Sequence, residues 1–384
     1  MIELKNLYKS YRGKSVLMNI SLTIQDNEFF VLIGSSGCGK TTLLKTLNKL
    51  NPIDKGEILI NGTPINRIKV TQLPRLMGYV VQEGGLFPHM TVEDNIALAM
   101  RVAGYPKEKI YDRITELLEL VNLEPDQYRS QYPSQLSGGQ RQRIGVARAF
   151  AADPEIILMD EPFSALDPMT RAELQDEVHR LQLRFHKTIV FVTHDMDEAV
   201  KLADRICILQ NGHVVQCDKP ENILKHPANE YINSFIGKNR LWENPSFIRA
   251  EDIMRPRPIT ISQSRTVVQA VQLMRHYNID SLLVTGDDNK FAGMVWLQDL
   301  IGIDQYSSPI SSFLSDDYLS VRVDDSLSTV LEKVADYGEK DLGILPVLDA
   351  EGAIRGFLNR SSLLSTLSRR FIDEPVERDE QEGA

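Results

Sequence analysis

The chain has 384 residues, of which 42% are hydrophobic and 25% charged, as in soluble globular proteins, and its length predicts two or three domains. The formal net charge of −10 and the lack of a basic stripe argue against nucleic acid as the main partner. Neither a run of eighteen apolar residues nor a signal peptide occurs, so we expect no membrane-spanning segment, and the three cysteines fit a reducing cytoplasm.

A glycine-rich segment follows an apolar run near the start of the chain. Residues 28–33 are mostly apolar and predict a buried strand, and residues 40–50 predict a helix. Between them, residues 34–41 fit the pattern G-x-x-x-x-G-K-[ST] of a phosphate-binding P-loop. The segment consists of Gly34, Ser35, Ser36, Gly37, Cys38, Gly39, Lys40 and Thr41.

Each part of this loop has a chemical task. Its glycines let successive backbone N–H groups turn toward phosphates, and the following helix adds its positive N-terminal end. Lys40 is placed for the β- and γ-phosphates, and the Thr41 hydroxyl for Mg²⁺. We therefore predict that the segment binds a nucleoside triphosphate. Cys38 is expected to be a small side chain of the loop rather than a redox site.

A second glycine-rich segment, residues 136–140, opens a good helix. Its first residues suit a phosphate, because an N-cap side chain and two glycines leave the amides open at the positive end of the helix dipole. One chain cannot easily present two helix ends to the same γ-phosphate from opposite sides. We therefore expect a head-to-tail homodimer with two nucleotides at its interface. The nucleotide-contacting residues here are Ser137, Gly138, Gly139 and Gln140.

Two further apolar runs, residues 156–159 and 188–192, predict buried strands that end at polar residues. Asp160 would hold the Mg²⁺ shell, and Glu161 could polarise a water molecule for in-line attack. A solvated turn is the alternative for two adjacent acids. His194 follows the second strand and could hydrogen-bond a γ-phosphate.

The C-terminal part contains an internal repeat. The apolar runs at 282–284 and 293–295 recur at 345–347 and 356–358, and Thr266 and Ser326 each open a helical pattern. Two copies of a strand–helix–strand–strand–helix unit would bury each other's apolar faces. The predicted boundaries are 1–237 for the first domain, 238–250 for a linker, 251–308 and 309–368 for the repeats, and 369–384 for an acidic, disordered tail.

The motifs of residues 1–237 resemble, in order, those of the nucleotide-binding subunit of ATP-binding-cassette (ABC) transporters. The resemblance implies an α/β fold, a P-loop NTPase cassette in which a mixed sheet carries a helical subdomain, with ATP and Mg²⁺ as ligands. It implies catalytic roles for Glu161, His194 and Gln82. It also implies that Thr41, Gln82 and Asp160 surround the Mg²⁺.

The same resemblance reaches residues outside the phosphate sites. Tyr11 is implied to stack on adenine, with Tyr8 as the weaker candidate, while Thr42 ends the Walker A segment and Asp167 belongs to the D-loop. Residues 82–92 resemble the importer segment that receives the coupling helix of an integral-membrane permease, and a plain surface loop is the alternative. These implications place the chain at the cytoplasmic face of the membrane as a peripheral protein.

The repeat resembles a tandem pair of cystathionine-β-synthase-type (CBS) regulatory domains of the α+β class, through residues 252–254 and 293–295. Such modules often bind adenine nucleotides through G-h-h-[ST]-x-x-D. Trp296 replaces the hydroxyl residue in the first copy, where we expect it to fill the core, and Ser362 replaces the acid in the second. Three roles stay open: binding cyclic di-AMP or another adenine nucleotide, responding to ionic strength, or holding the dimer.

A cassette joined to such a pair resembles the ATPase subunit of bacterial osmoprotectant importers. The implied cargo is a quaternary amine such as glycine betaine, carnitine or choline. An extracytoplasmic substrate-binding protein would then be an indirect partner. The alternatives are an importer ATPase for another small solute, such as an amino acid, and a soluble cassette that works without a permease.

Overall fold

In the computed structural model the chain forms two compact units, residues 1–236 and 237–384. None of the helices within the described residues is long and apolar enough to cross a bilayer. The predicted acidic tail and part of the predicted linker lie outside the described residues. Those residues are 1–82, 84–237, 240, 244–286, 288, 290–302, 306–315, 317–338 and 343–368.

The first unit contains a small antiparallel sheet with the strand order β2-β1-β4-β5. Alternating burial along β1 puts Ile2, Leu4 and Leu7 on the inner face, as expected for a sheet with one side toward a core. Its strands are β1 (Ile2–Tyr11), β2 (Lys14–Ile24), β4 (Lys55–Ile60) and β5 (Thr63–Pro64).

A six-stranded sheet forms the centre of the unit, with the order β10-β9-β3-β8-β7-β6. All its neighbouring pairs are parallel except β10 with β9, so the sheet is mixed, as predicted. The apolar runs at 28–33, 156–159 and 188–192 are buried strands of this sheet. Its strands are β3 (Phe29–Ile33), β6 (Met77–Val80), β7 (Ile156–Asp160), β8 (Thr188–Thr193), β9 (Arg205–Gln210) and β10 (His213–Asp218).

One core joins the two sheets. Phe30 and Leu32 of β3 pack in it with Leu43 and Leu44 of α1 (Lys40–Leu47) and with the inner face of the antiparallel sheet. Helix α1 ends three residues before the predicted position, because Asn48 caps it and Lys49 turns into the left-handed region with φ 61°. The remaining short elements near this core are η1 (Ile65–Arg67), η2 (Val70–Gln72) and α2 (Leu73–Leu76).

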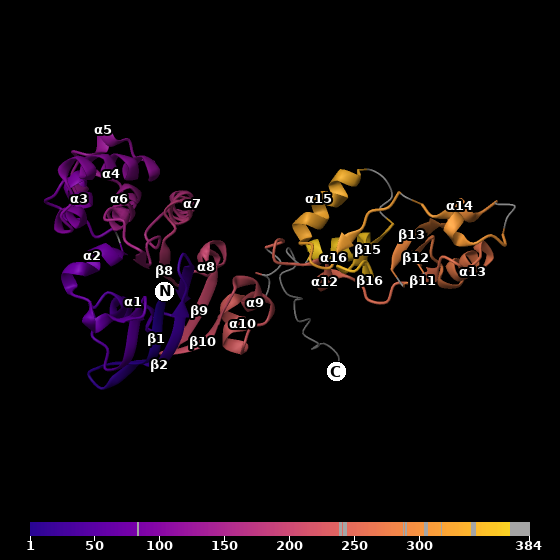
Figure 1. Cartoon of the computed structure of the whole chain (residues 1–384), viewed down its shortest axis with the longest axis horizontal. Coiled ribbons are helices and arrows are strands. Elements are labelled where there is room, and N and C mark those ends of the chain that lie inside the picture. The colour runs from indigo at the N-terminus through magenta and orange to yellow at the C-terminus, as the bar shows by residue number, and fades with distance from the viewer. Residues whose placement is uncertain are drawn as a thin grey trace, which may run out of the picture. The chain divides into compact units, whose positions relative to one another are not determined.

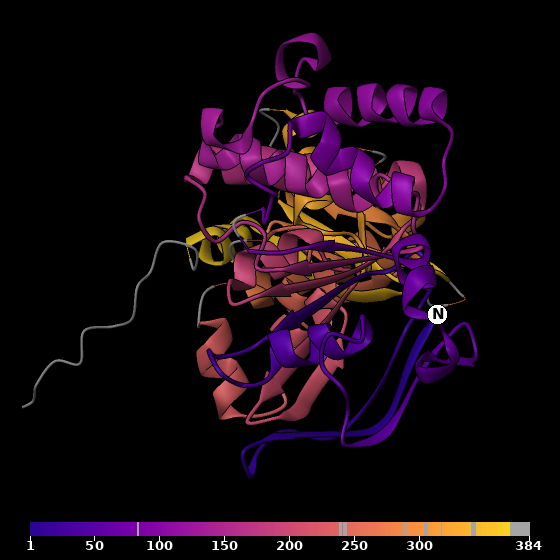
Figure 2. The same ribbon diagram turned by 90° about the vertical axis from the view of Figure 1, so that its left-hand side faces the viewer.

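The helices α3 to α6 gather on one side of the unit, away from β1 and β2 (Figures 1 and 2). Helix α6 packs against α3, α4 and α7, and it also reaches strand β6. This group is the predicted helical subdomain. The helices of the unit are α3 (Val92–Val102), α4 (Lys107–Leu120), α5 (Pro125–Tyr128), η3 (Pro133–Gln135), α6 (Gly138–Phe150), α7 (Pro168–Phe185), α8 (Met196–Leu202), α9 (Pro220–Lys225) and α10 (Glu230–Ile236).

The second unit contains the two predicted strand–helix–strand–strand–helix repeats. Each forms a three-stranded sheet with one parallel and one antiparallel pair, and Thr266 and Ser326 cap the helices that they were predicted to open. The first repeat is β11 (Thr260–Ser262), α13 (Val267–Tyr277), β12 (Ser281–Thr285), β13 (Phe291–Trp296) and α14 (Leu297–Leu300). The second is β14 (Val321–Arg322), α15 (Leu327–Tyr337), β15 (Ile344–Leu348), β16 (Ile354–Asn359) and α16 (Arg360–Ser368), preceded by η4 (Ile310–Phe313).

The segment that leads into the first repeat packs on the second. Ile248 and Ala250, at the start of α12 (Ala250–Ile253), are buried with Val321, Leu345 and Leu358. The last residues of the predicted linker are therefore part of a folded core. The mixed α/β unit followed by two α+β repeats agrees with the predicted fold class.

Candidate functional site

The P-loop lies at the carboxyl end of the buried strand β3. Lys40, the first residue of α1, is buried, and its Nζ donates to the backbone oxygens of Gly34 at 2.8 Å and Ser35 at 3.1 Å. Ser35, Ser36 and Gly37 are exposed, so the outer side of the loop is open. The ammonium group is thereby held against the backbone of a glycine-rich loop that opens a helix, a combination that recognises a polyphosphate.

Strand β9 closes the inner side of the loop. A Cβ atom at Gly34 would overlap the carbonyl oxygen of Leu209, so only glycine fits there. A Cβ atom at Gly37 would meet nothing within 4 Å, although its φ of 78° still favours glycine. Cys38 is buried behind the loop, and burial raises the pKa of its thiol, which agrees with its predicted passive role.

Thr41 and Asp160, predicted as Mg²⁺ ligands, meet in the structure. The Thr41 hydroxyl donates to Oδ1 of Asp160 at 2.7 Å, and Asp160 is buried at the end of β7. The Tyr79 phenol donates to Oδ2 of Asp160 at 3.3 Å. Burial, together with the Asp160 carboxylate, raises the pKa of Tyr79 well above its usual range, so the phenol stays a donor. The sequence around Tyr79 contains no motif that predicts this contact with Asp160.

This donor set suits Mg²⁺. Within the described residues no cluster of three or more His, Cys, Asp or Glu side chains could hold a metal ion by itself. Mg²⁺ in phosphate sites takes only one or two carboxylates, and phosphates and water complete its shell. The buried carboxylate of Asp160 and the hydroxyl of Thr41, next to the phosphate-binding loop, are therefore enough protein ligands for a Mg²⁺ ion that also binds phosphate and water.

Glu161, His194 and Gln82, the predicted catalytic residues, belong to one chain of contacts. Nδ1 of His194 lies 3.3 Å from Oε2 of Glu161. The Gln82 side chain donates to the Ser164 hydroxyl at 3.4 Å, and Ser164 donates to the backbone oxygen of Glu161 at 3.1 Å. Parallel pairing of β7 with β8 brings the residues that follow both strands to the same sheet edge.

The second glycine-rich segment caps helix α6. Oγ of Ser137 accepts from the Gln140 backbone amide at 3.2 Å, and Oε1 of Gln140 accepts from the Ser137 amide at 2.8 Å. The Gln140 side chain also donates to the Tyr128 hydroxyl at 3.0 Å, a partner that the sequence did not suggest. Asp167 caps α7 by accepting from the Thr170 amide at 3.1 Å, and the hydrogen bonds to Thr170 lower its pKa.

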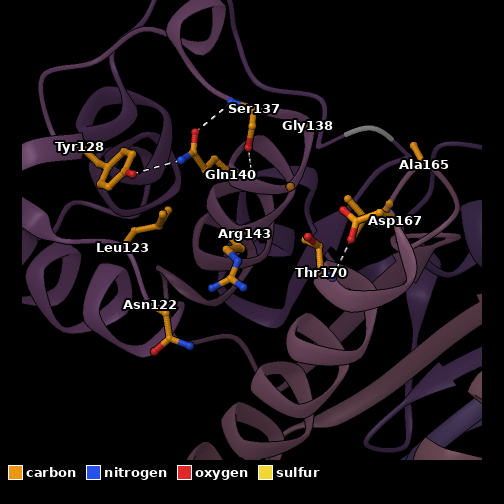
Figure 3. A pocket seen from close by; sticks show the side chains of 12 residues that line it. Asn122, Leu123, Tyr128, Ser137, Gly138, Gln140, Arg143, Ala165, Asp167 and Thr170 are labelled. Atoms are coloured by element: carbon orange, nitrogen blue, oxygen red, sulfur yellow. Dashed lines mark hydrogen bonds between the residues drawn. The ribbon is translucent and has the colours of Figure 1, made fainter.

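Ser137 and Asp167 line one cleft of about 570 Å³ between the starts of α6 and α7 (Figure 3). Gly138, Gly139 and Gln140 line it too. None of residues 34–42 is among its described lining residues. The predicted nucleotide-contacting residues of one chain are therefore divided between two surfaces, the P-loop and this cleft.

The remaining nucleotide candidates are exposed on β1 or lie within α1. Tyr11 is 43% exposed at the end of β1, and the Nζ atom of Lys9 lies 5.1 Å from its ring centroid. Tyr8 is exposed as well. Thr42 is half-buried in α1. An exposed tyrosine ring can stack on a base, and the adenine-stacking role of Tyr11 stays a prediction.

The segment after Gln82 is anchored to helix α6. The Arg148 guanidinium donates to the backbone oxygens of Gly84 at 3.0 Å and Gly85 at 2.9 Å. A mostly apolar groove of about 380 Å³ adjoins this segment. Its lining includes Phe87, Ala99 and Val102, and Phe87 is 43% exposed.

In the second unit, a cleft of about 450 Å³ lies where Trp296 and Asp299 of the first repeat face Asp317 and Tyr337 of the second. Trp296 is half-buried against Gly343 and lines this cleft, which differs from the expectation that it fills the core. Ser362, which replaces the acid in the second repeat, is buried and shares three hydrogen bonds with Asn359.

Comparison with known proteins shows the family of the chain. Residues 17–164 match the ABC transporter family, and residues 250–304 and 310–369 each match the CBS domain family. The choline transport ATP-binding protein OpuBA of Bacillus subtilis is 44% identical over 367 residues, covering 95% of both chains. The chain belongs to the ATP-binding subunits of ABC transporters. It is an ATPase with an ATP-binding cassette and a pair of CBS domains.

Two further comparisons support the assignment. The glycine betaine/carnitine/choline transport ATP-binding protein OpuCA of Bacillus subtilis is 44% identical over 366 residues, again covering 95% of both chains. The ATP-binding cassette MJ0796, solved as a dimer in a post-hydrolysis state with ADP and Pi, superposes with a TM-score of 0.53 at 33% identity. It covers 57% of this chain and 99% of its own.

Proposed function

We propose that this ATPase is the energy-coupling subunit of an importer for quaternary amine osmoprotectants such as glycine betaine, carnitine and choline. The observation that carries the proposal is the identity of 44% to two relatives named for these cargoes, over 95% of each chain. The cargo would be selected by a permease and an extracytoplasmic substrate-binding protein. The role of this chain is to supply the free energy of ATP hydrolysis.

In the proposed reaction, the residues around the P-loop bind and orient ATP. Lys40 neutralises phosphate charge, while Thr41 and Asp160 hold Mg²⁺, with Gln82 as a further ligand. When bound by these residues, Mg²⁺ would supply positive charge against the negative charge that develops on the phosphate oxygens. Tyr11 provides a face for the adenine ring.

Glu161 is the proposed general base, which takes a proton from the attacking water. His194 lies within 3.3 Å of the Glu161 carboxylate and orients it. Ser164 links the Glu161 backbone to Gln82, the first residue of the anchored segment. Through these contacts, a movement of Glu161 during the reaction can shift Gln82 and the groove next to residues 84–87.

Each nucleotide is proposed to lie between two copies of the chain. The P-loop and the cleft of Ser137 and Asp167 are different surfaces of one copy, so the cleft of one copy faces the P-loop of the other. The open amides of α6 then point at the γ-phosphate. The dimeric solved cassette supports this arrangement.

The groove beside Phe87 and Val102 is the proposed seat of a helix from the permease. Its mostly apolar lining suits an amphipathic helix, and exposed apolar patches of this kind typically mark docking sites. A permease bound there would hold the chain at the cytoplasmic face of the membrane as a peripheral subunit.

The catalytic part is tested with Glu161→Gln. The substitution keeps size and hydrogen bonding but removes the base, so we expect ATP hydrolysis to fall about 10²- to 10⁴-fold while ATP binding persists and a stable dimer accumulates. Hydrolysis and dimer formation are measured by phosphate release and gel filtration with MgATP. Hydrolysis at the normal rate by this variant would refute the role of Glu161.

The transport part is tested by uptake in the native host. We expect deletion of the gene to abolish import of radiolabelled glycine betaine, carnitine or choline under osmotic stress, and the wild-type chain to restore it. Affinity purification of the tagged chain should also yield an integral-membrane permease. Loss of amino acid import alone would point to another cargo, and a chain that purifies without any permease would point to a soluble cassette.

For the CBS pair we propose a regulatory adenine nucleotide, for which cyclic di-AMP is the first candidate. Trp296 offers a ring for base stacking at the cleft, and Asp299 stands at the acidic position of the nucleotide pattern. Binding of cyclic di-AMP, AMP and ATP to the full-length Glu161→Gln chain is measured by calorimetry, with Trp296→Ala as the control. A chain that binds none of them at the CBS pair would instead sense salt or only hold the dimer.

A further inference from the structure

Two of the three cysteines stand directly opposite each other in the six-stranded sheet. Cys207 of β9 and Cys217 of β10 are paired in the antiparallel register, so their side chains leave the same face. Directly opposed Cα atoms lie about 4.5–5.5 Å apart, within the range of about 4.4–6.8 Å that a disulfide requires. The register therefore puts the two Cα atoms at a separation that a disulfide can span.

The two thiols differ in a way that suits stepwise oxidation. Cys207 is fully buried in the core cluster against which Cys217 packs, and its neighbour Cys217, together with burial, raises the pKa of the Cys207 thiol. Cys217 is half-buried on the edge strand, and the Arg205 guanidinium donates to its sulfur at 3.3 Å. The neighbouring Cys207 thiol, with the Arg205 charge, lowers the pKa of Cys217.

The cationic neighbour of Cys217 is itself fixed. Arg205 donates to the Glu28 carboxylate at 3.0 Å and to the Thr23 backbone oxygen at 3.1 Å. The guanidinium therefore cannot easily turn away from the sulfur. A half-buried thiol beside a held positive charge, with a second cysteine directly opposite it on the next strand, is the microenvironment of an oxidant-sensitive cysteine pair.

We propose that Cys217 and Cys207 form a peroxide-sensitive modification site that closes to a reversible disulfide. The Cys217 thiolate attacks the O–O bond of a hydroperoxide, its sulfur is oxidised to a sulfenic acid, and the released hydroxide takes a proton to become water. The sulfur of Cys207 then attacks the Cys217 sulfur, and its proton leaves with the sulfenic hydroxyl as a second water. Two thiols and one hydrogen peroxide thus give one disulfide and two waters.

The site lies beside the nucleotide-binding loop. Leu209, two residues after Cys207, presents the carbonyl oxygen that closes off Gly34. The turn between β9 and β10 also contacts the loop, because the Gly212 amide donates to the Cys38 backbone oxygen at 3.2 Å. Oxidation of the pair would therefore alter a hairpin that supports the P-loop.

The test exposes the native full-length chain to micromolar hydrogen peroxide and maps the cysteines by mass spectrometry. We expect a peptide pair linked through Cys207 and Cys217 that dithiothreitol separates, while Cys38 keeps its thiol. In Cys207→Ser we expect a sulfenic acid at Cys217 that dimedone traps, and in Cys217→Ser no oxidation of Cys207 at the same dose.

A graded control comes from the arginine. Arg205→Lys keeps the charge and Arg205→Gln removes it, so oxidation of Cys217 should be several-fold slower in the glutamine variant than in the lysine variant, with circular dichroism checking the fold of both. The proposal is overturned if Cys38 reacts first. It is also overturned if Cys217 passes to sulfinic acid while Cys207 stays reduced, or if both arginine variants oxidise at the wild-type rate.

Discussion

Glu161 has a left-handed backbone with φ 45°, a conformation that costs a residue with a side chain about 1–2 kcal/mol. Its amide is held by the Val192 backbone oxygen at 3.0 Å, which helps fix this conformation. The consequence is an abrupt change of direction after Asp160, so that two adjacent acids serve different partners. Asp160 meets Thr41, and Glu161 meets His194.

Gly34 and Gly37 allow a matched test of how the P-loop is built. Gly34→Ala should lower the free energy of unfolding of the cassette by about 3 kcal/mol, because its methyl group would overlap a backbone oxygen that cannot easily move. Gly37→Ala should cost about 1 kcal/mol, since only its positive φ opposes a side chain. Urea denaturation of both variants without nucleotide measures the difference. Equal losses of unfolding free energy in the two variants would contradict the close packing of β9 against Gly34.

Some site contacts could be predicted from the sequence and others could not. The P-loop residues and Asp160 were predictable, because a short pattern and an apolar strand place them locally. The contact of Tyr79 with Asp160 was not, because it depends on the pairing of β6 with β7, two strands far apart in the chain. The pairing of Cys207 with Cys217 depends on the hairpin register in the same way.

Helix α6 connects three features of the cassette. Its N-terminus is the capped segment at Ser137, its middle contacts the backbone of Gly84 through Gly145, and Arg148 near its end binds Gly84 and Gly85. A single rigid element thus relates the proposed ATP-contacting cleft to the proposed permease groove. Helix starts at Ser137, Thr266 and Ser326 were predictable because an N-cap side chain is a local signal.

Arg148→Gln should weaken coupling more than catalysis. The variant loses two hydrogen bonds that anchor residues 84–85, so the groove should lose its shape while the P-loop stays intact. We expect basal ATP hydrolysis near the wild-type rate and at least a several-fold loss of permease-stimulated hydrolysis in proteoliposomes. Arg101→Gln removes only an exposed ion pair with Asp94 and serves as the control. Equal effects of both variants would refute the anchoring role.

The cassette has a hydrophobic core, and the second unit has one in each CBS repeat. The cassette core joins Phe30 and Leu43, and each CBS repeat has its own cluster around Val284 or Val347. The two repeats are not equivalent. The first contributes Trp296 and Asp299 to a cleft. In the second, Ser362 makes hydrogen bonds with Asn359, the residue just before α16. Repeat identity could be predicted from recurring apolar runs, but this difference depends on side-chain packing.

Truncation after residue 237 should separate catalysis from regulation. Because the cassette has its own core, the fragment 1–237 should fold and hydrolyse ATP at a rate close to that of the full chain. Its response to cyclic di-AMP and to salt should be lost. Steady-state hydrolysis of both proteins across salt concentration and nucleotide checks this expectation. A fragment that still responds to both would place the regulation within the cassette.

The separation of the P-loop from the cleft at Ser137 has a genetic consequence. A chain with a defective P-loop retains a sound cleft, and a chain with a defective cleft retains a sound P-loop. In the proposed dimer, a mixed pair of the two would contain one complete site and one doubly defective site. Two alleles that are each inactive alone would therefore complement each other in one cell, whereas two alleles affecting the same surface would not.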